Sequence, residues 1–190
     1  MRRLLAALVL LLAGLSPAVA QQAVHVPTYY GSVVNHATPI GATDVVCLEG
    51  AAGKVAKIAG FAISGTGATN VVVNIHILRR ITFNTGGTSV LVQSAKGSSA
   101  HADATSVMRV WSSNPTSLGT PDGVFRRIRW DVENKVTVPP TVGLIAQMAA
   151  NPYTTQPEAR GATQAICMNF NAPATATVMD ISMVWTETEN

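Results

Sequence analysis

The stretch Thr69–Phe83 (TNVVVNIHILRRITF) constrains the fold of this chain more than any other. Four apolar residues in its middle are separated by single neighbours: Val71, Val73, Ile75 and Ile77. Asn74 and His76 fall between them on the opposite parity. A period of two sends alternate side chains to opposite faces of a strand, and Val and Ile favour the pleated backbone. The stretch therefore predicts a long strand with one face in a core and the other face in a wetter environment.

The same alternation recurs in residues 54–64, 124–132 and 175–186, with turn residues between these segments. Only 12% of the residues are charged, and no segment repeats convincingly with a helical period. We therefore expect an all-β chain, a jelly-roll-like antiparallel β-sandwich. Gly65–Gly67 predicts a hairpin that leads into the long strand. The apolar parity of the strands predicts one shared core: Val73, Ile75, Ile77, Ile128, Trp130, Ile181 and Trp185.

The N-terminus has the pattern of a cleavable signal peptide covering residues 1–20. Arg2 and Arg3 precede an uncharged apolar run of 12 residues, which is shorter than the ~20 residues that span a bilayer. The small residues Ala18–Ala20 then precede Gln21, as at a signal-peptidase site. These features predict export to the periplasm or the extracellular space, with no membrane attachment once the leader is removed.

The remaining 170 of the 190 residues suit one domain. Residues 21–43 open irregularly, and we expect them to form an N-terminal arm or an edge strand. Residues 44–190 carry the alternating segments and are expected to form the jelly-roll domain.

Cys47 and Cys167 are the two cysteines of the chain. In an exported protein such a pair favours a disulfide, which here would join an early strand to a late one. Closing a loop of 120 residues contributes as much as ~5 kcal/mol on the chain-entropy model. Two separate buried thiols are the alternative.

Charge gives no support for a nucleic-acid partner. The chain has 13 Lys and Arg residues, two of them in the leader, against 10 Asp and Glu residues. The densest basic cluster contains Arg127 and Arg129, which alternation sends outward together. We expect them to pair with Asp131 or Glu133, and a contact with a glycan phosphate or a nucleic acid is the alternative.

Strong catalytic motifs are absent from the sequence: it has no P-loop, nucleophile-elbow, zinc-protease or Cys-x-x-Cys spacing. His101 and Asp103, in a loop of small residues, offer two metal ligands, and a third such as His76 would be needed. A solvated histidine beside a solvated aspartate is the simpler interpretation. We therefore predict no catalytic residues, no metal, no cofactor and no enzymatic activity.

Three tryptophans raise the alternative of a sugar-binding surface. Trp130 and Trp185 are in phase with core positions, whereas the strand that ends at Trp111 alternates poorly. Exposure of Trp111 and Tyr153 beside a groove would favour carbohydrate binding. The residues of the candidate binding surface are Trp111, Tyr153, His101, Asp103, Arg127 and Arg129.

Several segments together resemble a group of bacteriophage and prophage structural proteins. These segments are Gly86–Ser89, Ala102–Ala104, the strand ending at Trp111, Asn114–Thr120, Val184–Glu187 and the Cys47 strand before Lys54–Ile58. They are similar to jelly-roll proteins of the decoration or head-fibre type over roughly residues 44–187. The resemblance implies a non-enzymatic building block, commonly a homotrimer, on a virion surface or in a fibre. A secretion leader departs from that pattern.

We therefore expect a structural or interaction protein that self-associates and displays a surface, with a trimer as the first expectation. The alternative is a secreted module that binds carbohydrate or another cell-surface polymer, and a virion or cell-surface glycan is the partner expected in either case. Self-association also agrees with a set of apolar residues that have little charge around them: Val72, Leu78, Val90, Val92, Met108 and Val110.

Overall fold

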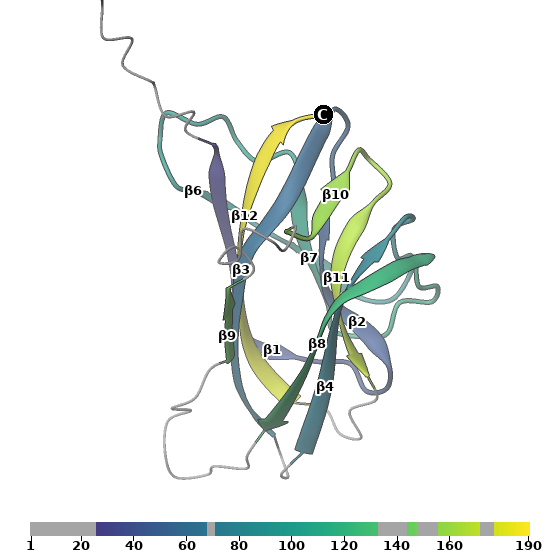
Figure 1. The fold of residues 1–190 in the computed structure, drawn as a ribbon. Helices are drawn as coiled ribbons and strands as arrows, with labels where there is room; N and C mark the ends of the chain where they lie inside the picture. The colour runs from purple at the N-terminus through teal and green to yellow at the C-terminus, as the bar shows by residue number, and fades with distance from the viewer. Residues whose placement is uncertain (1–25, 68–70, 133–143, 148–155, 172–176) are drawn as a thin grey trace, which may run out of the picture.

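The computed structural model describes residues 26–67, 71–132, 144–147, 156–171 and 177–190. These residues form twelve strands and no helix, in two antiparallel sheets that pack face to face (Figure 1). The alternating segments thus form a β-sandwich, as the sequence predicts. The predicted signal peptide, residues 1–20, lies outside the described residues.

Each sheet has six described strands. Sheet A contains, in spatial order, β10 (Glu158–Arg160), β3 (Lys54–Gly67), β12 (Thr177–Glu189), β1 (Thr28–Ala37) and β6 (Ala95–Lys96), with β9 (Leu144–Gln147) also beside β3. Sheet B contains β5 (Ser89–Val92), β7 (Val107–Trp111), β2 (Thr43–Glu49), β11 (Ala165–Asn171), β4 (Val71–Arg80) and β8 (Pro121–Val132).

The strand pairs are nested along the chain, which is the arrangement of a jelly roll. β1 pairs with β12, β2 with β11, β3 with β9 and β10, and β4 with β8. β5, β6 and β7 form an insertion between β4 and β8. Two strands of the insertion extend sheet B beyond β2, and the third adds two residues beside β1.

The hairpin predicted at Gly65–Gly67 is wrong, because β3 and β4 belong to different sheets. Both strands are amphipathic, and placing them in opposite sheets lets Ile63 and Ile75 face the same core. A hairpin would have kept both strands in one sheet. The burial of the two apolar faces against each other decides the path of the chain here.

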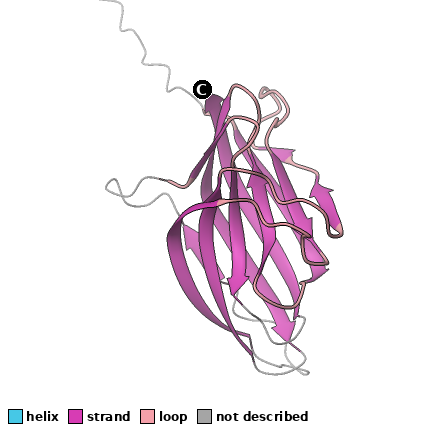
Figure 2. Cartoon of the chain, turned by 90° about the vertical axis from the view of Figure 1, so that its right-hand side faces the viewer, coloured by secondary structure: helices cyan, strands magenta, loops and turns pink. Residues whose placement is uncertain are grey.

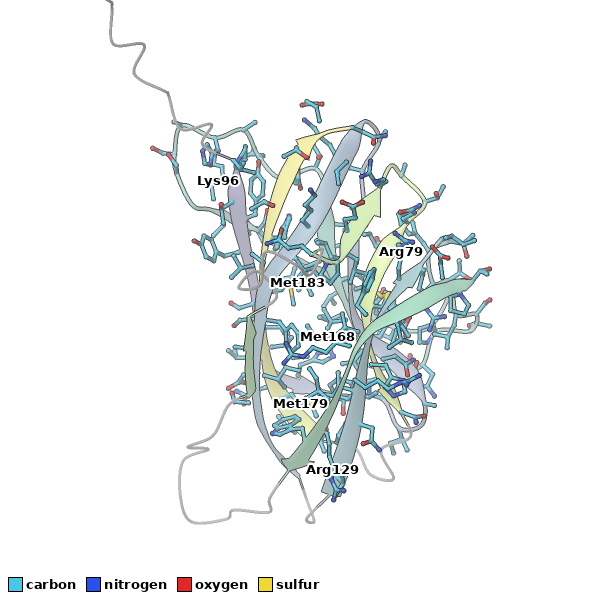
Figure 3. The ribbon with its side chains drawn as sticks, viewed as in Figure 1. Arg79, Lys96, Arg129, Met168, Met179 and Met183 are labelled. Atoms are coloured by element: carbon cyan, nitrogen blue, oxygen red, sulfur yellow. A yellow bond between two sulfur atoms is a disulfide. The ribbon has the colours of Figure 1, made fainter. Side chains whose placement is uncertain are left out.

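The predicted core is confirmed. Six of the seven predicted residues lie in one buried cluster between the sheets: Val73, Ile75, Ile77, Trp130, Ile181 and Trp185. Ile128 is partly buried and packs against that cluster, because it lies on β8 at the edge of sheet B. Three methionines, Met168, Met179 and Met183, fill the space between the sheets (Figure 3).

The segment expected as an arm or edge strand contributes a strand of sheet A. β1 runs from Thr28 to Ala37 and pairs with β12 along most of its length. On its other side, among the described residues, it pairs with a strand only at Tyr29 and Tyr30, which lie beside β6. Residues 28–37 are therefore part of the sandwich, and the rest of β1 lies at the margin of sheet A.

Candidate binding face on sheet B

The outer face of sheet B, which points away from the core, carries most of the polar residues singled out above. Figure 2 views the molecule from this side and shows loops that run across the strands. We distinguish two halves of this face. The covered half consists of Cys47, Leu78, Arg80, Trp111 and Cys167, and the open half consists of Asn74, His76, Arg127, Arg129, Asn169 and Asn171.

The predicted disulfide is confirmed and lies in the covered half. Cys47 of β2 and Cys167 of β11 are direct partners across the two strands, with Cα atoms 4.0 Å apart. Leu78, Trp111 and Ala165 bury both sulfurs in a small second core, separate from the core between the sheets. The disulfide therefore ties together two central strands that are far apart in the sequence.

Trp111 does not form the exposed stacking surface that the carbohydrate alternative required. Its side chain is 1% exposed, because it packs into the second core beside the disulfide. The Arg109 guanidinium lies 6.0 Å from the centre of its ring, held there by Glu49 through two hydrogen bonds. Tyr153, its expected companion, lies outside the described residues.

A buried ion pair marks the boundary between the halves. The Asp44 carboxylate is fully buried and accepts two hydrogen bonds from Arg80, at 2.7 and 2.9 Å. It also accepts bonds of 2.8 Å from the side-chain amides of Asn84 and Asn169. All four bonds are needed, because a buried charge is tolerated only when its partners replace its hydration.

The covering loops are joined to this ion pair. Arg80 donates to the carbonyl of Gly119, and the backbone N–H of Gly119 donates to the Asn84 side chain. A Cβ at position 119 would lie 1.8 Å from the carbonyl oxygen of Thr82, so only glycine fits at this crossing. The two ends of the insertion are thus held against sheet B at one point.

The open half contains two rows of polar residues across three neighbouring strands. Asn169, His76 and Arg127 are successive partners on β11, β4 and β8. Asn171, Asn74 and Arg129 form the second row in the same way. His76 and Asn169 are half-buried, and the other four residues are exposed.

Arg127 and Arg129 point outward, as alternation predicts, and Figure 3 places Arg129 at the end of the sandwich remote from the C-terminus. Of their predicted partners, Glu133 and the side chain of Asp131 lie outside the described part of the chain. Asn169 and Asn171 were not singled out from the sequence. The alternation of β11 was the available signal, since it sends both residues to the face opposite Phe170.

The other predicted site residues do not come together. Asp103 is exposed and pairs with Lys96 at 3.0 Å, and His101 is half-buried in the same loop. Among the described residues, His76 does not join them in a cluster of ligands. The cluster that does form, Asp44 with Cys47 and Cys167, is unsuited to a metal, because the sulfurs are bonded to each other.

Two pockets lie away from this face. One of about 400 Å³ is lined by Tyr29, Lys54 and Glu187 among others, and burial, followed by the charge of Glu187, raises the pKa of Tyr29. Glu187 accepts hydrogen bonds from Thr105 and Ser106, so its carboxylate is already satisfied. The second pocket, about 350 Å³, lies beside Arg79, whose guanidinium is held by Asp122 at 2.9 Å.

Comparison with protein-family models, with curated proteins and with solved structures finds no match. The resemblance to phage jelly-roll proteins therefore stays a prediction. No described residues form a helix with the length and apolar character needed to cross a membrane. That finding and the disulfide are compatible with export.

Proposed function

We propose that this protein is a non-enzymatic structural or interaction module, a jelly roll that self-associates through one edge of the sandwich and displays its remaining surface. A closed trimer is the assembly we propose first, on the resemblance to phage decoration and head-fibre proteins. The proposed location is outside the cytoplasm, either by export or on a virion surface.

The observation that carries this proposal is the exposed apolar surface of β5. Val90 and Leu91 are 56% and 57% exposed and lie on opposite faces of this strand. β5 is the last strand of sheet B on its side, so one row of its backbone N–H and C=O groups has no strand partner among the described residues. An apolar edge strand is a template for pairing with another chain. Neighbouring copies of this protein in a closed trimer would cover these side chains and the exposed strand edge.

Only part of the apolar set that the sequence suggested for self-association is exposed in the structure. Met108 and Val110 are fully buried in the main core, and Leu78 is buried in the second core. Val72 remains 43% exposed and Val90 56% exposed. The case for self-association therefore depends on the β5 edge rather than on the whole set.

Light scattering on the protein at micromolar concentrations tests the proposal. The wild-type mass should equal that of three chains, and the double substitution V90K/L91K should reduce it to that of one chain, because two charges cannot be buried unpaired at the interface. Val124→Lys is the matched control, since Val124 is 43% exposed on β8 at the opposite edge of the same sheet. A wild-type mass of one chain at every concentration would contradict self-association.

A different observation favours the alternative function, a secreted module that binds carbohydrate or another cell-surface polymer. That observation is the open half of sheet B, with its exposed arginines and asparagines. It supports binding through charge and hydrogen bonds, without the stacking platform expected from Trp111.

A further inference from the structure

We propose that the open half of sheet B binds an anionic polysaccharide, a glycan chain that carries carboxylate or sulfate groups. This inference names the ligand class for the alternative, carbohydrate-binding function, and it is independent of self-association through β5. The ligand would lie across β11, β4 and β8, with an anionic group at Arg127 and its hydroxyls at the asparagines.

The first argument is the charge of Arg127. Four other described arginines have a carboxylate partner within 3.1 Å: Arg79, Arg80, Arg109 and Arg160. The side chain of Arg127 is exposed and forms no hydrogen bond or ion pair with the residues that the structure describes. Its guanidinium is therefore available for a carboxylate or sulfate, which it can bind through two parallel hydrogen bonds.

The second argument is the spacing of the polar groups. Neighbouring strands lie ~4.8 Å apart, and residues i and i+2 of one strand lie ~7 Å apart. The two rows Asn169–His76–Arg127 and Asn171–Asn74–Arg129 thus form a grid of hydrogen-bonding groups on one face of the sheet. Side-chain amides both donate and accept hydrogen bonds, which suits sugar hydroxyls. A repeating polymer can use several such positions at once.

The third argument distinguishes a charged glycan from a neutral one. The six residues of the open half include no Trp, Tyr or Phe, its one ring is the half-buried imidazole of His76, and Trp111 and Trp130 are buried elsewhere. Stacking on a sugar ring is therefore not offered by these residues. Recognition of a polymer through this face has to come from charge and hydrogen bonds, which favours a glycan with anionic groups.

The lack of a stacking surface also argues against a single-stranded nucleic acid as the ligand. Proteins that bind single strands without sequence preference combine basic grooves with aromatic side chains on which the bases stack. The open half has the basic residues and the amides but not the stacking surface. The near balance of basic and acidic residues after the leader points the same way.

The ion pair at the boundary orients one member of the grid. The Asn169 amide donates to Asp44 at 2.8 Å, and Arg80 fixes Asp44 in turn. The Asn169 side chain is thereby held in one orientation beside its partner His76. Less conformational entropy is lost when a ligand binds to a group that is already ordered.

Binding is tested by affinity electrophoresis of the purified protein in gels that contain alginate, dextran sulfate or neutral dextran, together with binding to an oligothymidylate. We expect retardation by alginate or dextran sulfate, weakening with salt because exposed charges are screened, and none by dextran. Alginate separates a carboxylate ligand from a sulfate ligand. Arg127→Gln should weaken binding about tenfold or more, because the charge-assisted contact of the guanidinium is lost, and Arg127→Lys should restore part of it.

Three controls make the result specific. Arg160→Gln removes the same charge from an exposed position on β10 of sheet A and should change binding less than about twofold, as a remote surface site would. V90K/L91K should still bind, which separates this site from the self-association edge. Thermal unfolding of Arg127→Gln should match wild type, because the side chain is exposed.

Four outcomes would overturn the proposal. They are equal loss of binding in Arg127→Gln and Arg160→Gln, retardation by neutral dextran as strong as by the anionic polymers, tighter binding to the oligothymidylate than to either anionic glycan, and no retardation by any polymer. The third would assign the face to nucleic acid instead.

Discussion

The two halves of the outer face of sheet B share β4 and β11, but one half is covered by the chain and the other is open to solvent. In the covered half, β2, β4 and β11 carry a disulfide, Leu78 and a buried arginine under the ends of the insertion. A few residues along β4 and β11, and on the neighbouring β8, the open half presents asparagine, histidine and arginine to solvent. The difference shows that the outer face of one alternating strand can be buried in one part and exposed to solvent in another, depending on which loops of the chain cover it. The predictions below test this contrast.

The largest effect is expected at the ion pair that closes the covered half. Asp44→Ala should lower the free energy of unfolding by ~3–5 kcal/mol, because it leaves Arg80 buried without its charge partner. Denaturant unfolding measures this. Arg127→Ala, which removes a charge from the open half, should stay within ~0.5 kcal/mol of wild type. Equal losses in the two variants would remove the distinction between the halves.

Two adjacent residues on β4 test whether the strand has one face in the main core and the other face in solvent. Ile75→Ala should cost ~2–5 kcal/mol, since Ile75 is fully buried in the main core. Asn74→Ala, one residue away on the outer face, should change stability by ~0.5 kcal/mol or less. The check is the same unfolding titration on both variants. A small cost at Ile75 would mean that the register of β4 is wrong.

The disulfide in the covered half should contribute less to the free energy of unfolding than the ion pair or Ile75. Replacing Cys47 and Cys167 together with alanine should cost ~2–4 kcal/mol, because the unfolded chain loses a long covalent loop. Peptide masses with and without reductant show whether the bond is present in the purified protein. Alkylation of both cysteines without reductant would contradict the bond.

The smallest stability effect is expected in the open half. The double substitution N74A/R127Q should leave the unfolding free energy within about 0.5 kcal/mol of wild type, because both side chains are exposed. Thermal and denaturant unfolding provide the measurement. A loss of several kcal/mol would show that these residues support the sheet and would weaken their assignment to ligand binding.

Much of the fold was predictable because it follows from local periodicity. Alternation along β4, β8 and β12 identified the strands and assigned Ile75, Trp130 and Ile181 to the core. The pairing of Cys47 with Cys167 followed from there being two cysteines in a chain that is predicted to be exported. The hairpin at Gly65–Gly67 was wrong because turn residues do not specify whether the next strand returns to the same sheet.

The site was less predictable, because it depends on contacts between distant segments. Tryptophan is a residue type that often binds sugars, so the sequence made Trp111 a candidate for the binding surface. Its burial results from packing against β2 and β11. Asp44 and Arg80 lie 36 positions apart, and nothing in either local pattern indicates a buried pair. Asn169 and Asn171 join His76 and Asn74 on one surface only because β11 pairs with β4.

The sequence by itself determined that this chain forms strands, which side chains of each strand face a core, and that the core is large enough for a sandwich. Those properties arise from the period of two and from the burial of apolar side chains. The tertiary structure alone decided which part of the outer face of sheet B is covered. That choice depends on the insertion between β4 and β8, whose ends meet Arg80 and Asn84 through the backbone of Gly119. Hydrogen bonds of this kind to the backbone leave little trace in the sequence, because every residue except proline offers both an N–H and a C=O, and the glycine that this crossing requires does not identify its partners.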